Sequence, residues 1–375
     1  MILTIISHTP HFLINGSIHG WEPTIREINH LSVIFTKIYH IAPFYDYGVH
    51  NAMGRYNSNN IEFVPIKPSG GKGIFNKIDI LFKIPYNLKK IIRTCKNTDW
   101  IQFRGPTNLG LYVLPYISYF SSKYRWVKYA GDWNQYKPPL SYLFQRHWLN
   151  NNFQKSIVTI NGTFVNQKRH LLSFENPCLT EKELIEANLN FKSKSYLKKL
   201  NLCFIGRMDN EKGSTKLVNA LKNMNDNSWI GDVFFIGDGP QKKWCQEKAN
   251  SIDNLNTVFT GFIPRSQLNQ VYKKCHILIL PSTASEGFPK VIAEGAAHGL
   301  VPIVSDVGGI GKYIDMSNGV IINEASAKQI LSKLIWLEKN RPILKRMANN
   351  SSQLSKIFTY EQYNKKIRNI IDSSA

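Results

Sequence analysis

The segment LCFIGRMDNEKG at residues 202–213 joins a short β-rich apolar run to a turn that carries two cations, Arg207 and Lys212. We predict a strand, then the turn, then a helix. In that unit, backbone N–H groups, the helix dipole, an arginine fork and a lysine charge can converge on a diphosphate. A capped helix with exposed basic residues explains the same pattern.

Short apolar runs alternate with segments of helical period on both sides of this unit, which is the pattern of parallel sheets covered by crossover helices. The fold class is therefore α/β. The strands are predicted at Ile2–Ser7, Lys37–Ala42, Ile61–Pro65, Trp100–Phe103, Trp126–Ala130, Ile157–Ile160, Leu202–Ile205, Val233–Ile236, Val258–Thr260, Ile277–Leu280 and Pro302–Val304. The apolar pattern thins between Pro177 and Lys199, and we place an interdomain linker there.

Length and composition bound the class of protein. A chain of 375 residues exceeds the roughly 250 to 300 residues at which one core stops growing, so we expect two domains. A 43% hydrophobic and 19% charged composition excludes collagen-like and disordered proteins. The net charge of +21 attracts phosphates, nucleic acid or anionic lipid, with a solvated basic surface as the plain alternative. Five widely spaced cysteines favour reduced thiols in the cytoplasm.

A second motif, PSTASEGFPKVIAE at residues 281–294, places two carboxylates eight positions apart across a strand-to-helix junction. If the helix begins near Phe288, Glu286 precedes it and Glu294 lies about two turns further on, so the two could meet a sugar and a ribose. Each carboxylate can accept two hydroxyl hydrogen bonds. The alternative is dipole compensation by Glu286 and a solvated face for Glu294.

Together these motifs resemble the retaining glycosyltransferases of family four (group 1), which have the GT-B fold of two facing Rossmann-like domains. The resemblance runs through FIGRM (204–208), FIGDGP (235–240), FTGFIP (259–264), the two glutamates and VSDVGGI (304–310). Residues 358–371 resemble the helix that in this family crosses back onto the first domain. The resemblance implies an acceptor-binding domain at 1–180, a nucleotide-sugar-binding domain at 196–357 and a crossover helix at 358–375.

The resemblance also implies roles for residues in the second domain. Arg207 and Lys212 would bind the donor diphosphate and stabilise the leaving group, Glu286 would contact the donor sugar, and Glu294 would hold the ribose hydroxyls. Ile263 would lie against the base. Sugar and phosphate would meet the backbone of a turn made of Gly287, Phe288, Pro289, Lys290 and Val291, in which Pro289 has no N–H to offer.

Two positions in the first domain are less specific. NGSIHG at 15–20 resembles the glycine loop that closes over the donor phosphates, and Gly16 would lie there, with an ordinary strand-to-helix turn as the alternative. Many members carry a His where this chain has Ala130. The nearby Asp132 could orient an acceptor hydroxyl as a catalytic group, but Asp at a strand end is often a cap or turn residue.

The expected function is transfer of a sugar from a UDP- or GDP-sugar to a hydroxyl of a glycan or lipid-linked acceptor, without a metal or other cofactor. Cell-surface polysaccharide synthesis at the inner face of the cytoplasmic membrane is the expected setting. The basic first domain would attach to anionic lipid through residues 75–95, for which a crossover helix with a solvated basic face is the alternative. A GT-B epimerase or phosphorylase remains open. A nucleic-acid-binding protein leaves the two glutamates unexplained, so we expect no nucleic acid partner.

Overall fold

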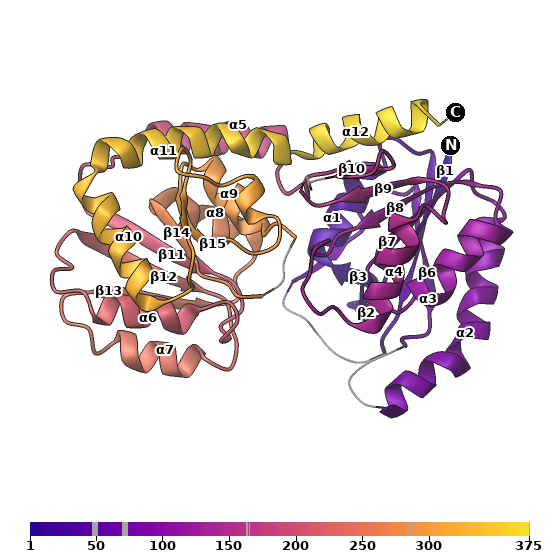
Figure 1. Ribbon diagram of the computed structural model, residues 1–375, viewed down its shortest axis with the longest axis horizontal. Helices are drawn as coiled ribbons and strands as arrows, with labels where there is room; N and C mark the ends of the chain where they lie inside the picture. The colour runs from indigo at the N-terminus through magenta and orange to yellow at the C-terminus, as the bar shows by residue number, and fades with distance from the viewer. Residues whose placement is uncertain (47–51, 70–73, 163, 165, 285–286, 375) are drawn as a thin grey trace. The chain divides into compact units, whose positions relative to one another are not determined.

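The computed structural model of the chain forms two compact units (Figure 1). Unit 1 comprises residues 1–176 and 362–375, and unit 2 comprises residues 177–361. The residues described below are 1–46, 52–69, 74–162, 164, 166–284 and 287–374.

Unit 1 contains a seven-stranded parallel sheet in the order β10-β9-β8-β7-β1-β4-β6. Its strands are β1 (Ile2–Ile6), β4 (Lys37–Pro43), β6 (Ile61–Ile66), β7 (Trp100–Gly105), β8 (Tyr124–Tyr129), β9 (Ile157–Ile160) and β10 (Leu171–Ser173). Its helices are α1 (Glu22–Leu31), α2 (Ile74–Cys95), α3 (Gly110–Pro115), the π-helix η1 (Tyr116–Phe120) and α4 (Leu140–Asn150). Because neighbouring strand residues point to opposite faces, Ile101 and Trp100 enter two separate core clusters.

A small antiparallel sheet, with strands on both sides of α1 in the sequence, was not expected. It consists of β2 (His11–Ile14), β3 (Ser17–Trp21) and β5 (Met53–Arg55). Asn15 and Gly16 connect β2 to β3 with φ values of 48° and 75°, the left-handed geometry of a two-residue hairpin turn. The ordinary strand-to-helix turn, given as the alternative for this segment, is therefore wrong, because Asn-Gly favours a tight hairpin. The donor contact of Gly16 stays a prediction.

Unit 2 contains a six-stranded parallel sheet in the order β13-β12-β11-β14-β15-β16. Its strands are β11 (Leu200–Ile205), β12 (Ile230–Ile236), β13 (Asn256–Gly261), β14 (Ile277–Leu280), β15 (Val301–Ser305) and β16 (Val320–Ile322). Its helices are α5 (Glu181–Lys192), α6 (Ser214–Lys222), α7 (Lys242–Ala249), α8 (Arg265–Lys274), α9 (Lys290–Ala297), α10 (Ala327–Lys339) and α11 (Arg341–Leu354), with 3₁₀ turns η2 (Ile310–Lys312) and η3 (Ser355–Phe358). The strand order reverses between β11 and β14, where ligands of open α/β sheets bind.

The segment expected as a linker is part of unit 2. Thr180 and Glu183 form a reciprocal capping box at the start of α5, which satisfies two helix N–H groups. Further along, the buried Lys194 donates to three backbone carbonyls, those of Tyr272, Cys275 and His298, at 2.6 to 3.0 Å. The linker prediction is wrong because α5 and the buried Lys194 belong to unit 2, although Lys192, Lys198 and Lys199 are exposed.

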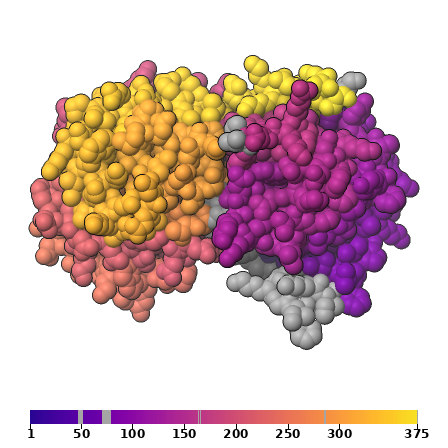
Figure 2. Space-filling model, viewed as in Figure 1, coloured from indigo at the N-terminus to yellow at the C-terminus, as the bar shows by residue number. Residues whose placement is uncertain are grey.

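The last helix, α12 (Tyr360–Asp372), carries the chain from unit 2 into unit 1. Its apolar face, which includes Ile367, Ile370 and Ile371, packs in the cluster that also holds Leu3 of β1 and Trp126 of β8. In Figure 2 this yellow segment lies against the indigo-to-magenta residues of unit 1. The closing helix expected from the sequence is present.

Candidate functional site

Two loops of unit 2 meet at the strand-order reversal. The loop after β11 ends at Gly213, whose φ is 80° and whose added Cβ would lie 2.5 Å from the Pro281 carbonyl oxygen. The Thr283 N–H donates to the Glu211 carbonyl at 2.7 Å. Only glycine fits this close approach, so residues 206–213 are held against the loop that follows β14.

Loops from two further strands join them. After β12, an added Cβ on Gly237 would lie 2.0 Å from the Gly206 carbonyl oxygen, and the Met208 N–H donates to the Asp238 carbonyl at 2.8 Å. After β15, the Gly309 N–H donates to the Gly287 carbonyl at 2.6 Å. Four loops thus converge at one carboxyl edge of the sheet.

Arg207 and Lys212 both belong to the first of these loops, and Asp209 organises them. The Arg207 Nε donates to Asp209 Oδ2 at 2.5 Å, and the Lys212 backbone N–H donates to Oδ1 at 2.8 Å. Partial burial opposes ionisation of Asp209, but these two bonds and the two positive charges hold its pKa below the usual range. The Arg207 side chain is 70% exposed. The cations precede α6, which begins at Ser214, rather than opening it.

Glu294 is buried on α9 and is already hydrogen-bonded within the protein. Its Oε1 accepts from Nη1 of Arg265, and its Oε2 accepts from the Tyr272 hydroxyl at 3.0 Å. Arg265 also contacts Glu183 Oε1 at 3.3 Å and the Cys178 carbonyl at 2.6 Å. Burial disfavours the charge on Arg265, yet the two carboxylates outweigh it and raise its pKa. The ribose contact of Glu294 stays a prediction.

The turn at residues 287–291 lies where α9 begins. Pro289 is the residue before the helix, which starts at Lys290 rather than near Phe288. The Phe288 ring is buried and stacks on Phe358, with centroids 4.7 Å apart. Only the backbone of Phe288 is therefore available for a ligand. Val291 packs against the unit 2 core, and Glu286 lies outside the described residues.

Ile263 and Asp132 lie in loops after strands of different units. Ile263 follows β13 and packs, half-buried, against the unit 2 core. Asp132 follows β8 in unit 1, where its Oδ1 accepts from the Asn134 N–H at 2.9 Å. This hydrogen bond is typical of a turn residue, which was the alternative role for Asp132. Its catalytic role stays a prediction.

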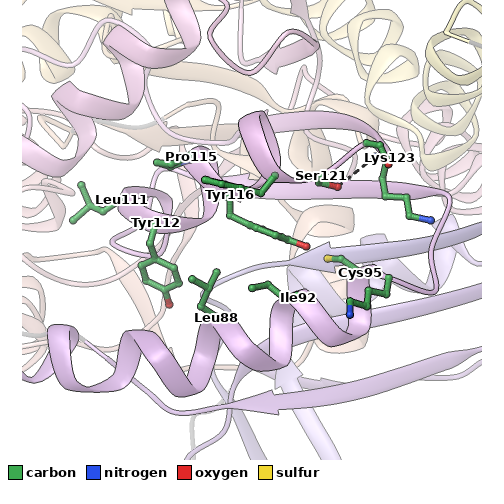
Figure 3. A pocket seen from close by; sticks show the side chains of 12 residues that line it. Leu88, Ile92, Cys95, Leu111, Tyr112, Pro115, Tyr116, Ser121 and Lys123 are labelled. Atoms are coloured by element: carbon green, nitrogen blue, oxygen red, sulfur yellow. Dashed lines mark hydrogen bonds between the residues drawn. The ribbon is translucent and has the colours of Figure 1, made fainter.

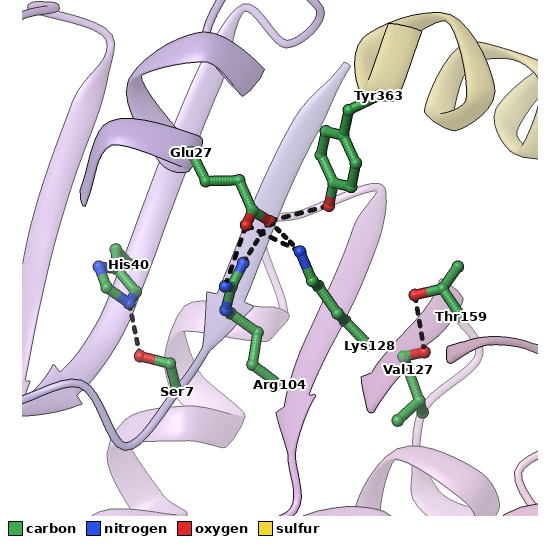
Figure 4. Close-up of polar contacts among 8 residues, drawn as sticks. All are labelled: Ser7, Glu27, His40, Arg104, Val127, Lys128, Thr159 and Tyr363. Carbon is green, nitrogen blue, oxygen red and sulfur yellow. Dashed lines mark hydrogen bonds and ion pairs between the residues drawn. The ribbon is translucent and has the colours of Figure 1, made fainter. Parts of the chain in front are cut away.

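Sequence reasoning missed a buried charge cluster in unit 1 (Figure 4). Glu27 of α1 accepts from Arg104 of β7 at 2.6 and 3.3 Å, from Lys128 of β8 at 2.7 Å on both oxygens, and from the Tyr363 hydroxyl at 2.9 Å. The four residues are far apart in sequence, so no local motif predicts the cluster.

A hydrogen-bonded chain of side chains was missed as well. His11 Nδ1 lies 2.8 Å from the Thr9 carbonyl, which can only accept, so the proton is on Nδ1 and Nε2 accepts from Tyr56. His40 Nδ1 then donates to Tyr56 at 2.6 Å, and its Nε2 accepts from the Ser7 hydroxyl. Burial lowers the pKa of both histidines, that of His11 to about 4. Both rings are therefore neutral at pH 7.

No cluster of three or more His, Cys, Asp or Glu side chains in the described part of the chain is arranged to hold a metal ion.

Solved structures share this architecture over the whole chain. Sucrose-phosphate synthase from Thermosynechococcus elongatus superposes with a TM-score of 0.71 at 14% identity, covering 99% of this chain and 98% of that one. Anabaena Alr3699/HepE in complex with UDP gives 0.71 at 15% identity, covering 99% of both chains. At such low identity the likeness shows the fold alone, which is the GT-B fold of glycosyltransferases.

The family follows from the sequence of unit 2. Residues 186–354 match the family model described as glycosyl transferases group 1. An uncharacterized glycosyltransferase, MJ1178, from Methanocaldococcus jannaschii is 28% identical over 45% of this chain and 47% of its own length. The putative teichuronic acid biosynthesis glycosyltransferase TuaC of Bacillus subtilis is 30% identical over 36% and 32%. The chain thus matches less than half the length of these two relatives. Residues 186–354 belong to the group 1 glycosyltransferase family.

Proposed function

We propose that the protein transfers a sugar from a UDP- or GDP-sugar to a hydroxyl of a glycan or lipid-linked acceptor, with retention at the anomeric carbon. The observation that carries the proposal is the convergence of four loops at the strand-order reversal of unit 2, with Arg207 and Lys212 in one of them. These loops lie in the segment that matches the family. HepE, which shares the fold, was solved with UDP and with UDP-glucose, which supports a nucleotide-sugar donor.

The chemistry asked of the protein is charge stabilisation. Arg207 and Lys212 would neutralise the departing diphosphate, and the backbone turn at 287–291 would hold sugar and phosphate. Glu286 would orient the donor sugar, while Glu294 would turn from Tyr272 to the ribose. A donor phosphate oxygen can take the acceptor proton, so the scheme requires neither a side-chain base nor a metal.

The proposed setting is polysaccharide synthesis at the inner face of the cytoplasmic membrane. TuaC is named for teichuronic acid biosynthesis, and a 23% identical relative from Klebsiella pneumoniae is named for its cps region. No helix in the described residues combines the length and apolar composition needed to cross a bilayer. Attachment to anionic lipid through the basic face of unit 1 is part of the proposal.

Calorimetry on the full chain with UDP and GDP tests the donor site. We expect one of them to bind, and Arg207→Ala to weaken its binding at least tenfold, since a charge-assisted contact is lost. Lys243→Ala is the control, because that α7 lysine is 89% exposed. Failure of both nucleotides to bind would overturn the proposal. Free sugar as the sole product, or a requirement for inorganic phosphate, would instead indicate an epimerase or a phosphorylase.

A further inference from the structure

Unit 1 contains a groove that takes no part in the donor site. It lies between α2 and the α3–η1 pair and has a volume of about 760 Å³ (Figure 3). The side chains of Leu88, Ile92 and Cys95 enter it from α2, opposite Tyr112 and Tyr116. Its volume lies within the range of sites that enclose a small ligand.

The groove is apolar along its length and basic at its rim. Lys96, Lys123, Ser121 and Ser122 line it together with eight apolar or aromatic side chains, Leu88, Ile92, Cys95, Leu111, Tyr112, Pro115, Tyr116 and Phe120. A smaller hollow of about 390 Å³ shares Leu88, Ile92 and Lys96 and adds Lys89 and Arg93. No acidic residue lines either space, and within the described residues none of these four cations forms an ion pair. The rim is therefore complementary to an anion.

Large apolar side chains on α2 and η1, the elements that border the groove, are exposed to solvent. Leu81 and Phe82 on α2 are 66% and 80% exposed, and Tyr119 and Phe120 on η1 are 61% and 80% exposed. The alternative for residues 75–95, a crossover helix that packs on the core, holds at Ile91 and Cys95, which are buried in a unit 1 core cluster, but not at the exposed Leu81 and Phe82. Exposed apolar side chains on the elements that form an apolar groove with a basic rim are typical of a surface that inserts into lipid.

We propose that this groove holds the hydrocarbon chain of an anionic membrane lipid, with its phosphate at the lysine rim formed by Lys96 and Lys123. The charge complementarity of the rim selects the headgroup, and the apolar lining receives the chain. Leu81, Phe82, Tyr119 and Phe120 contact the surrounding lipid. This goes beyond electrostatic attachment, because it assigns one lipid molecule to one site, and it does not depend on sugar transfer.

Titration of the full chain with dodecyl phosphate, kept below its micelle concentration, tests the groove directly. We expect one site per chain. Burial of a methylene group should change affinity about fourfold, so decyl phosphate should bind roughly tenfold to twentyfold more weakly. Dodecyl phosphocholine should bind at least tenfold more weakly than dodecyl phosphate, because its headgroup has no net charge. Equal binding of all three ligands would overturn the proposal, as would full competition by inorganic phosphate.

Variants locate the site. Ile92→Glu places a carboxylate in the groove lining and should weaken binding of dodecyl phosphate at least tenfold. The control Ile185→Glu, on an exposed face of α5, should leave that binding unchanged. The double variant Lys96→Glu, Lys123→Glu should weaken binding of dodecyl phosphate but not binding of decanol. It keeps the test valid if Ile92→Glu fails to fold. If the variant with both lysines replaced binds dodecyl phosphate as tightly as the parent, the proposed lipid site is overturned. The readout needs no nucleotide, so loss of UDP or GDP binding would refute only the proposed function.

Discussion

The Tyr363 hydroxyl donates to Glu27 Oε1 at 2.9 Å, across 336 positions of the sequence. Glu27 is 2% exposed, and it faces two cations on neighbouring strands, Arg104 and Lys128. Burial alone would lower the pKa of Arg104, but the charge and hydrogen bonds of the adjacent Glu27 carboxylate act against it, so the pKa is raised. A single carboxylate thus compensates two buried positive charges and also fastens the last helix of the chain.

Glu27→Gln should therefore be severely destabilising. It removes the countercharge that Arg104 and Lys128 share, which should cost about 3 to 5 kcal/mol in the free energy of unfolding. Tyr363→Phe removes one hydrogen bond and should cost about 1 kcal/mol. Urea unfolding measures both, with Tyr136→Phe, at an 83% exposed site, as the control. A loss for Glu27→Gln no larger than that for Tyr363→Phe would contradict the charge balance.

Stability should fall in mild acid because buried histidines resist protonation. Burial, followed by nearby cations, lowers the pKa of His276 to about 4 and of His298 to about 3, and burial lowers that of His11 to about 4. In the unfolded chain they titrate near 6.5, so between pH 6.5 and 4 the unfolded state binds more protons. Each of these histidines should lower the free energy of unfolding by about 3 kcal/mol at pH 4 relative to pH 7.

Chemical unfolding at pH 7, 6 and 5 measures this dependence. His276 accepts from the Asn201 N–H and donates to the Ser195 carbonyl, each at 3.0 Å, so His276→Gln keeps a donor and an acceptor while removing the titration. The variant should show a shallower pH slope than the parent. An unfolding free energy that is flat from pH 7 to 5 would exclude the effect.

Two glycines with similar backbone angles should respond differently to alanine. Gly16 has a φ of 75° and open space around it, so Gly16→Ala should cost only the left-handed strain, about 1 kcal/mol. Gly213→Ala adds a clash with the Pro281 carbonyl and should cost more. It should also weaken UDP or GDP binding, because the Arg207 loop must move. Equal melting temperatures and equal nucleotide affinities in both variants would refute this difference.

The two glutamates of the 281–294 motif should affect different parts of the donor. Glu294→Ala should weaken binding of the nucleoside diphosphate, whereas Glu286→Ala should mainly weaken binding of the intact nucleotide sugar. Glu183→Ala is the matched control, since it also removes a carboxylate from Arg265. If calorimetry gives the same loss of UDP or GDP affinity for Glu183→Ala and Glu294→Ala, Glu294 acts through Arg265 and not on the ribose.

The fold of unit 2 could be predicted because buried parallel strands are nearly continuous apolar runs. Ile277–Leu280 was predicted and is observed with the same bounds, and β11 begins only two residues before its predicted start. The β2–β3 hairpin was missed although Asn15-Gly16 is a hairpin signal, because a glycine after the first strand was assigned to a phosphate loop. The Thr180 to Glu183 capping pattern likewise indicates a helix where a linker was expected.

The site is less predictable than the fold. Arg207 and Lys212 could be placed together from the sequence because they lie in one short loop, while their contact with a diphosphate stays a prediction. The pairing of Arg265 with Glu294 and the cluster around Glu27 depend on residues brought together only by the tertiary structure, 29 and 77 or more positions apart. No spacing rule connects such residues, so the partners that occupy Glu294 could not be foreseen.

The place of α12 in unit 1 has a consequence for how the chain acquires its structure during translation. Strands β1, β4, β7 and β8 emerge from the ribosome early, but the core that contains Leu3, Trp100 and Trp126 is completed by Tyr363 and Ile367. At about 5 to 20 residues per second, the intervening chain takes roughly 10 to 40 s to synthesise. During that interval unit 1 carries an uncovered apolar surface, whereas unit 2 is assembled from one continuous stretch. The earliest part of the sequence is thus the later of the two to reach its final packing.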